Sequence, residues 1–480
     1  MLGESVGAML FPQRDELTYQ GECGLAIVYD TYQSEAPQRL PLLSATDPSR
    51  VLVRRRGEAV SAAQFLAQVH AVAAGLPAAA AVNLCEDRYA FLVAFCAIAL
   101  RGQTNLLPSS RAPQAVDEVM AAHPGCYALG EQALDPAPPG YRQLPPLNVT
   151  RLLDGDANWP MIPADQVVAI GYTSGSTGVP SANEKTWGSF HASTNGNLAM
   201  LQAAIGRQFE IVATVPPQHM YGMEMSVLLP LLGEIGVHAG RPFFPADVAA
   251  ALAEVPTPRL LVTTPVHLRA LVESGIALPP IAAMMSATAP LPVELARSAE
   301  QRFGAPVLEV FGSTETCVFA SRRPVVDEDW SLYDGVALHP QPDGTAIEAP
   351  QLDAPVTLAD IVSLSDGGRR FRLCGRHADM LEIAGKRASL GDLSRRLLAI
   401  PGVQDGVVFQ LDGGDALDVH RIAALAVAPG LDEHVILDAL RRAIDPLFLP
   451  RPLRLVHALP RNETGKLPRA ALLELLHHHD

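Results

Sequence analysis

A loop of small residues follows a short apolar run in the first half of the chain. The run, residues 167–170, reads Val-Val-Ala-Ile, which is typical of a buried strand. Glycines let backbone N–H groups turn toward an anion and hydroxyls add donors, so the loop has the chemistry of a phosphate cradle. An ordinary connecting loop has the same composition, and the Lys-Ser or Lys-Thr of a Walker P-loop is missing. The loop consists of Thr173, Ser174, Gly175, Ser176, Thr177 and Gly178.

A second polar cluster follows the strand-like residues 306–310. A carboxylate at the end of a strand, next to hydroxyls, suits a magnesium-bound nucleotide, because Mg²⁺ takes oxygen ligands. Here Glu315 would hold the metal and Phe311 would cover a base. The alternative is a helix N-terminus with an acidic residue in its first turn. The cluster consists of Phe311, Gly312, Ser313, Thr314, Glu315 and Thr316.

Two further signals lie in the last third of the chain. Asp360 is the kind of acidic residue that accepts hydrogen bonds from ribose hydroxyls, and Arg376 would add positive charge toward phosphate or ribose. Lys466 follows Gly465 before a C-terminal helix, where its ammonium group would reach a phosphate or a carboxylate as a point charge. Solvated arginines and a surface lysine are the alternatives at these positions.

In this order, the four signals resemble the adenylate-forming superfamily, which includes acyl- and aryl-CoA synthetases, peptide-synthetase adenylation domains and luciferases. Residues 215–222, Val-Pro-Pro-Gln-His-Met-Tyr-Gly, resemble its histidine-containing segment near the acyl pocket. Residues 286–291, Ser-Ala-Thr-Ala-Pro-Leu, resemble its adenine-contact loop. The resemblance covers residues 83–469. Residues 185–187 and 385–390 are also similar to the AMP-ligases of aryl-polyene and polyketide pigment clusters, which load a carrier protein.

The resemblance implies a nucleotide site built from separate parts of the chain. Residues 173–178 would bind the β- and γ-phosphates and help to release pyrophosphate. Thr314 and Glu315 would hold the α-phosphate and Mg²⁺. Asp360 would bind both ribose hydroxyls, with Arg376 nearby.

The resemblance also implies the residues around the reacting carboxylate. Lys466 would bridge the carboxylate of the substrate and the α-phosphate during adenylation. His219 would line the boundary between the acyl pocket and the thiol tunnel, and Thr288 would belong to the adenine loop. Lys466, Glu315 and His219 are therefore the candidate catalytic residues.

Three positions depart from the family pattern. The phosphate loop usually continues with Pro-Lys-Gly, but here the first basic residue is Lys185, four places late, which leaves its role open. The hinge aspartate falls at Ala378, and Asp379 follows one residue later, so we expect Asp379 to take the hinge role. The usual Thr-Gly before the ribose aspartate is absent, whereas Glu315, Asp360 and Lys466 are all retained.

Strand and helix patterns alternate along the chain, which predicts an α/β fold. Apolar residues 89–100 predict a core helix, because a membrane span takes ~20 residues. A second amphipathic helix is predicted over 292–303. Strands are predicted over residues 166–172, 211–215, 260–264, 281–286 and 307–311.

The pattern restarts near residue 378 as helix, strand, strand, helix, strand, helix. We therefore predict a large, multi-subdomain N-terminal α/β domain over 1–374. A small, mobile α+β C-terminal domain, over 375–480, would carry the catalytic lysine. The segment 364–375 is the candidate interdomain junction.

Composition restricts the partners. The net charge of −15 is uneven, with −17 in residues 1–366 and +2 in residues 367–480. A nucleic-acid binder would show a basic excess, so we expect no nucleic-acid partner. Six scattered cysteines without a Cys-x-x-Cys pair, and an N-terminus without a signal peptide, favour a reduced, cytoplasmic setting.

The resemblance implies ATP- and Mg²⁺-dependent activation of a carboxylic acid, followed by transfer of the acyl group to a phosphopantetheine thiol. Residues 219–225 and 284–288 hold methionines and few charges, so an aromatic or acyl acid fits better than an amino acid. We favour an acyl carrier protein as the acceptor, and free coenzyme A in an acyl- or aryl-CoA ligase is the alternative. A non-catalytic nucleotide-binding homologue is the alternative from another class.

Overall fold

The computed structural model describes residues 38–44, 47–55, 57–147, 159–173, 181–341, 344–376, 380–383, 386–411, 422–461, 465 and 467–477. All of them belong to one compact unit, Gln38–Asp480. Within these residues no helix is long and apolar enough to cross a membrane.

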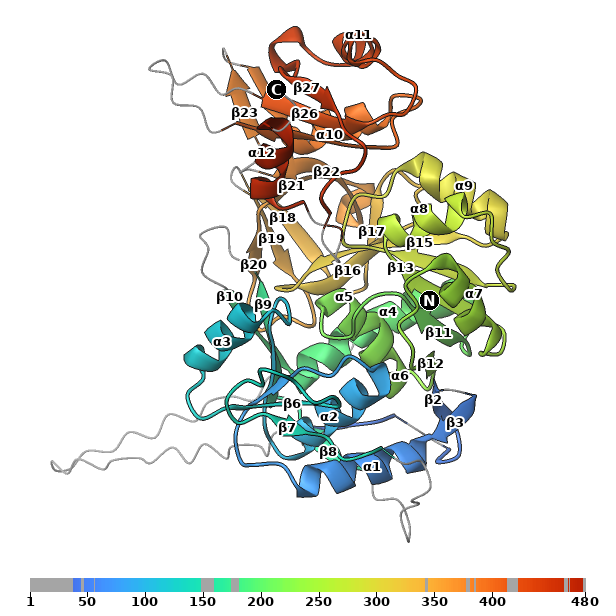
Figure 1. The fold of residues 1–480 in the computed structure, drawn as a ribbon, viewed down its shortest axis with the longest axis vertical. Helices are drawn as coiled ribbons and strands as arrows, with labels where there is room; N and C mark the ends of the chain where they lie inside the picture. The colour runs from blue at the N-terminus through green and yellow to red at the C-terminus, as the bar shows by residue number, and fades with distance from the viewer. Residues whose placement is uncertain are drawn as a thin grey trace, which may run out of the picture. The chain divides into compact units, whose positions relative to one another are not determined.

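An eleven-stranded mixed sheet forms the centre of the large N-terminal domain (Figure 1). Its neighbours β2, β12, β11, β13, β14 and β15 run parallel, and the remaining strands pair antiparallel at the two edges. The strands in spatial order are β21 (Asp360–Ser365), β22 (Arg370–Arg376), β17 (Trp330–Leu332), β16 (Cys317–Arg322), β15 (Val307–Ser313), β14 (Ala283–Ser286), β13 (Arg259–Thr263), β11 (Glu210–Ala213), β12 (Gly236–His238), β2 (Val51–Arg55) and β3 (Glu58–Ser61).

Helices cover both faces of this sheet, because alternate strand residues point to opposite sides. On one face, Val212, Leu261 and Met284 pack against apolar residues of α7 (Pro245–Ala253), α8 (Pro265–Glu273) and α9 (Val293–Phe303). On the other face, Ile211 and Met285 share a core with α4 (Trp187–Ile205), α5 (Met220–Met223), the π-helix η1 (Glu224–Leu228) and α6 (Leu229–Leu232).

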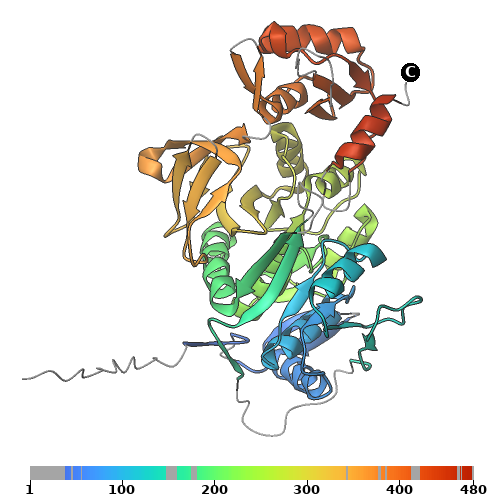
Figure 2. The ribbon, with the colours of Figure 1, turned by 90° about the vertical axis from the view of Figure 1, so that its left-hand side faces the viewer.

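A six-stranded sheet is formed by the part of the chain between β3 and β11. Helix α2 (Arg88–Leu100) packs against it, and α1 (Ala62–Ala74) lies beside α2 (Figure 2) and contacts β2 and β3; α3 (Pro113–Ala122) follows. Its edge strand β10 continues directly into α4. The strands in spatial order are β10 (Ser181–Thr186), β9 (Val167–Thr173), β5 (Asn105–Leu107), β4 (Ala81–Asn83), β6 (Tyr127–Gly130) and β7 (Arg142–Gln143). Two smaller sheets join β1 (Arg39–Pro41) to β8 (Met161–Pro163), and β18 (Ala337–Gln341) to β19 (Gly344–Glu348) and β20 (Val356–Leu358).

The smaller C-terminal domain has its own sheets and apolar cores. A hairpin precedes a three-stranded sheet in the order β25-β26-β27. The elements are β23 (Met380–Ile383), β24 (Lys386–Ser389), α10 (Leu390–Leu398), β25 (Asp405–Gln410), β26 (Ile422–Val427), α11 (Glu433–Ala443), β27 (Leu453–Leu455) and α12 (Arg469–His477). Short 3₁₀ turns, η2 (Asp366–Gly368) and η4 (Pro446–Phe448), complete the described elements.

The predicted α/β fold and its elements are confirmed, with two corrections. The five predicted strands are β9, β11, β13, β14 and β15, and the predicted helices are α2 and α9. The segment 364–375 is not a junction, because most of it pairs in the β21–β22 hairpin. The predicted domain boundary after residue 374 therefore falls inside β22. The C-terminal domain begins with the hairpin β23–β24 rather than with the predicted helix. The hairpin was not predicted because each of its strands is only four residues long.

Candidate active site

The polar cluster at 311–316 forms the tight turn between β15 and β16. The backbone N–H of Ser313 donates to Oγ1 of Thr316 at 3.1 Å, and the N–H of Thr316 donates to Oγ of Ser313 at 3.3 Å. A Cβ on Gly312 would lie 2.2 Å from the carbonyl oxygen of Cys317. The helix alternative is wrong, since β16 begins at Cys317. The turn leaves Thr314 and Glu315 half-buried at its tip.

Cys317 closes this turn in an uncommon backbone conformation. Its φ is +57°, a region that side chains other than glycine rarely adopt. Such strained residues persist where the surroundings fix them, and they gather at functional sites. Burial raises the pKa of the Cys317 thiol to about 12, so it remains a neutral packing group.

The structure brings the start of the phosphate loop to this turn. Thr173 ends β9, and its hydroxyl lies 2.6 Å from that of Ser181 on β10. Two residues earlier, a Cβ on Gly171 would lie 3.0 Å from the side chain of Thr314 and 3.5 Å from that of Met220. The loop residues Ser174, Gly175, Ser176, Thr177 and Gly178 lie outside the described residues.

Asp360 and Arg376 are direct cross-strand partners at the end of the β21–β22 hairpin. The hydroxyl of Thr345 donates to the carbonyl oxygen of Asp360 at 2.7 Å, which ties this end to β19. Two residues that are sixteen positions apart in the sequence are thus held opposite one another. Ala378 and Asp379, the predicted hinge, lie outside the described residues.

Lys466 also lies outside the described residues, but the neighbouring Gly465 does not. A Cβ on Gly465 would lie 3.4 Å from that of Ala289 and 3.8 Å from Oγ1 of Thr288. Thr288 itself has a φ of +79°. Gly465, the neighbour of the candidate lysine, therefore lies against the predicted adenine loop.

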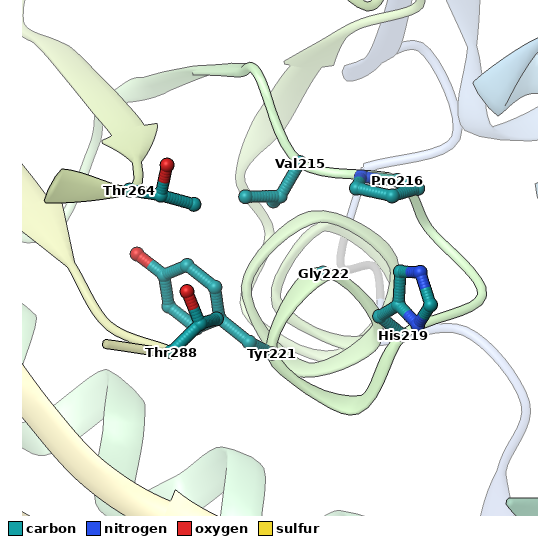
Figure 3. Close-up of a pocket in the computed structure, with 7 residues that line it drawn as sticks. All are labelled: Val215, Pro216, His219, Tyr221, Gly222, Thr264 and Thr288. Carbon is teal, nitrogen blue, oxygen red and sulfur yellow. The ribbon is translucent and has the colours of Figure 1, made fainter. Parts of the chain in front are cut away.

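A pocket opens beside Thr288, between the ends of β11, β13 and β14 and the start of α5 (Figure 3). The hydroxyl of Tyr221 donates to the carbonyl oxygen of Met285 at 3.0 Å, and burial holds its pKa well above the usual range. None of the lining residues is acidic. They are Val215, Pro216, His219, Tyr221, Gly222, Thr264 and Thr288.

Gly222 and Arg88 fix the wall of this pocket. A Cβ on Gly222 would lie 1.9 Å from the carbonyl oxygen of Pro216, so only glycine lets the loop approach α5. The fully buried guanidinium of Arg88 donates to the carbonyl oxygens of Ala213 and Val215, each at 3.0 Å, and to Ser226. Burial lowers the pKa of Arg88 to about 9. The sequence marked Arg88 only as the boundary of a helix.

Two more buried charges lie behind the β15–β16 turn. Lys185 is 4 % exposed, and its Nζ donates to the carbonyl oxygen of Glu315 at 2.7 Å. Glu224 is 1 % exposed and accepts from the backbone N–H of Val318 at 3.0 Å. Sequence patterns did not identify Glu224, because it stands between the methionines of an apolar segment.

Comparison with known proteins agrees with this arrangement. The family model described as AMP-binding enzyme matches residues 44–341. The chain belongs to the family of AMP-binding enzymes. This confirms the resemblance to the adenylate-forming superfamily and makes the chain an AMP-forming ligase. The matched residues include Thr173, His219, Thr288 and Glu315, and they end before Asp360.

Individual relatives extend this result. A 4-coumarate–CoA ligase of Rhodobacter capsulatus is 29 % identical over 310 residues, which cover 62 % of this chain and 74 % of that protein. A 4-coumarate–CoA ligase of Halorhodospira halophila is 30 % identical, with 62 % and 73 % covered. In fold, the enzyme is similar to the o-succinylbenzoate CoA synthetase of Bacillus subtilis solved with an acyl-adenylate intermediate. The TM-score is 0.75 at 17 % identity, over 91 % of this chain and 98 % of that one.

Phe311 of this AMP-binding enzyme belongs to an aromatic cluster. Its ring centroid lies 5.4 Å from that of Phe319, 5.2 Å from Trp330 and 5.8 Å from Phe371. The cluster fixes the position of the ring, and its contact with a base stays a prediction.

The carboxylate of Glu315 suits a magnesium ion bound through a nucleotide. No group of three or more His, Cys, Asp or Glu side chains that could hold a metal occurs among the described residues. Mg²⁺ usually keeps several waters and is held by one or two carboxylates together with substrate phosphates. A single half-buried carboxylate at the tip of a turn fits that mode of binding.

Proposed function

We propose that this enzyme uses ATP and Mg²⁺ to activate an aromatic or other apolar carboxylic acid as an acyl-adenylate. We further propose that it transfers the acyl group to the phosphopantetheine thiol of an acyl carrier protein. The convergence of β9, the Glu315 turn and α5 supports this function, because Gly171 lies against Thr314 and against Met220, which stands between the pocket residues His219 and Tyr221. Nucleotide phosphates and a carboxylic acid would meet at that point.

The first half-reaction joins two anions. A carboxylate oxygen attacks the α-phosphorus of ATP, pyrophosphate leaves with the electrons of the broken P–O bond, and an acyl-AMP remains. Catalysis of such a displacement is mostly positioning and neutralisation of charge. Bound Mg²⁺, held by Glu315, would supply positive charge to the phosphate oxygens. Thr314 would orient the α-phosphate, and Asp360 would hold the ribose opposite Arg376.

Lys466 is proposed to bridge the carboxylate and the α-phosphate. The position of its neighbour Gly465 against Thr288 and Ala289 supports this role, since the same loop then reaches the mouth of the pocket. His219 begins α5 as its N-cap residue and lines the pocket, as expected for a residue between acid and thiol.

The pocket supports an uncharged acyl group. An amino acid would present an ammonium group, which needs a buried carboxylate partner. Glu224 belongs to the same segment, but it accepts hydrogen bonds from Asn197 and Val318 and is not among the lining residues. The uncharged threonine, tyrosine, valine and proline side chains that line the pocket therefore favour an aromatic or aliphatic acid over an amino acid.

The acceptor has two candidates. Similarity of residues 185–187 to carrier-loading AMP-ligases supports a carrier protein, whereas the names of the two 4-coumarate–CoA ligase relatives favour coenzyme A. Adjacent arginines in the C-terminal region do not distinguish coenzyme A from a carrier protein, because several of them form ion pairs within the chain. Arg395 and Arg396 both pair with Asp392, and Arg441 pairs with Asp438. In either case we propose that Asp379 acts as the hinge for the second half-reaction.

ATP–pyrophosphate exchange across benzoates, hydroxybenzoates, cinnamates, fatty acids and amino acids tests the proposal. We expect exchange with aromatic or aliphatic acids and none with amino acids. We expect Lys466→Ala to reduce exchange by about 10²–10³-fold, as for loss of one preorganised charge donor. Near-normal exchange in that variant would contradict the role of Lys466. Incubation of the wild type with coenzyme A or a holo carrier protein then identifies the acceptor from the thioester formed.

A further inference from the structure

Three backbone groups of the β15–β16 turn are held by side chains from other parts of the chain. Lys185 of β10 donates to the carbonyl oxygen of Glu315 at 2.7 Å. Gln351 donates to the carbonyl oxygen of Thr316 at 3.0 Å. Glu224 of η1 accepts from the N–H of Val318 at 3.0 and 3.1 Å. Side chains from three separate parts of the chain therefore fix the backbone from Glu315 to Val318.

Glu224 is itself held in one orientation. Its carboxylate accepts from Asn197 Nδ2 at 3.1 Å and from the hydroxyl of Ser193, both on α4. Asn197 in turn accepts from the hydroxyl of Tyr333 at 3.1 Å. Burial raises the pKa of Glu224, while these hydrogen bonds and the charge of Lys185 oppose the shift. Burial of a single carboxylate or ammonium group costs several kcal/mol of desolvation free energy, and a nearby opposite charge offsets much of that cost.

Lys185 is not placed to contact a phosphate. Its side chain is buried, and its Nζ is bonded to the main chain of Glu315. On β10 it is also the one residue that is buried, and it stands one position before the N-cap Thr186 of α4. The lysine that follows the phosphate loop in this chain thus acts on the neighbouring loop.

We propose that Lys185 and Glu224 are positioning residues that hold the backbone of the Glu315 turn, and so place the Glu315 carboxylate for Mg²⁺. This inference rests on the proposed nucleotide site. Residues behind a metal ligand orient it, and their loss typically reduces metal affinity by about 10- to 100-fold. Because Glu224 lies in the helix that follows His219, the pair also links the acyl pocket to the metal side of the site.

Calorimetric binding of ATP with and without Mg²⁺ tests the inference without knowledge of the acid. We expect Lys185→Met to raise the Mg²⁺ concentration for half-maximal ATP binding by about 10- to 100-fold. Binding of ATP in the absence of Mg²⁺ should change less than about twofold, since Nζ of Lys185 is bonded to the main chain of Glu315. We expect Lys185→Arg, which keeps the charge and a donor, to recover part of the loss.

Arg322→Met is the matched control, because Arg322 pairs with the buried Glu309 on the same hairpin, far from the turn. It should lower the unfolding temperature and leave the Mg²⁺ dependence of ATP binding unchanged. If Lys185→Met fails to fold, the neutral double variant Lys185→Met/Glu224→Gln carries the test and should show the same Mg²⁺ defect. A Mg²⁺ dependence equal to that of Arg322→Met would overturn the inference. Failure of the wild type to bind Mg²⁺–ATP would instead overturn the proposed function.

Discussion

The hairpin β15–β16 carries buried charges at both ends, and the two ends are built differently. At the open end, Glu309 and Arg322 are direct cross-strand partners, with Nε of the arginine 2.7 Å from Oε2 of the glutamate. The guanidinium also lies 4.4 Å from the ring centre of Trp330. At the turn end, Lys185 and Glu224 come from other elements and bond the backbone rather than each other.

This difference separates stability from function within one hairpin. Glu309 is 4 % exposed and paired inside the hairpin, so its charge serves the fold. Glu315 is half-buried at the tip, and Lys185 holds its main-chain carbonyl group rather than its carboxylate. We therefore propose different roles for these two glutamates, which are six residues apart: Glu309 stabilises the fold and Glu315 binds Mg²⁺.

Substitution of Glu315 or Glu309 by glutamine should give the largest difference in activity between the two ends of the hairpin. Glu315→Gln should reduce ATP–pyrophosphate exchange by about 10²–10³-fold, because a preorganised charge is lost. Its free energy of unfolding should change by less than about 0.5 kcal/mol, as for a surface substitution. Glu309→Gln should leave exchange per folded molecule unchanged. Equal losses of exchange in the two variants would remove the distinction between the two ends.

Loss of the arginine at the open end should be a pure stability effect. Arg322→Met leaves a buried carboxylate without its partner, which costs about 3 kcal/mol in the free energy of unfolding. Urea denaturation measures this cost. Addition of Glu309→Leu should restore most of the stability, since an apolar pair of similar volume can replace a buried ion pair. A loss under about 1 kcal/mol in Arg322→Met would show that the pair contributes little.

The same comparison explains what the sequence could and could not predict. The position of Glu315 at the end of a strand and next to hydroxyl residues was predictable, because the strand, the hydroxyl neighbours and the turn are contiguous in the sequence. Asp360 and Arg376 were predicted to lie near one another, but their direct cross-strand pairing came only from the register of a hairpin that was not expected. Lys185 acts 130 residues away from its position in the chain, through a main-chain oxygen that has no sequence signature. The sequence predicted a basic residue after the phosphate loop but not its role. Its partner, the carbonyl group of Glu315, is identified only because β10 of the six-stranded sheet lies beside the β15–β16 turn of the eleven-stranded sheet.

The loss of unfolding free energy in Arg322→Met should depend on pH. Burial raises the pKa of Glu309, and Arg322 opposes that shift, so Arg322→Met should raise it further. A carboxyl whose folded pKa is raised holds its proton when the unfolded form has released it, and stability then falls as pH rises through that interval. The difference between wild type and Arg322→Met should therefore be small near pH 5 and grow toward pH 8. A pH-independent difference in urea midpoints would assign the cost to lost packing on Trp330 instead.

The smallest expected effect is at the turn itself. Ser313→Ala removes the hydroxyl that accepts from the N–H of Thr316, while Lys185 and Glu224 still hold the adjacent backbone. We expect a loss of about 1 kcal/mol in unfolding free energy, typical of one hydrogen bond. Ser363→Ala, at an exposed position of β21, is the control and should be neutral. Because the buried charges carry the placement of Glu315, the Mg²⁺ dependence of ATP binding in Ser313→Ala should shift less than in Lys185→Met. A larger shift would mean that the hydroxyls of the turn, rather than the charges behind it, position the carboxylate.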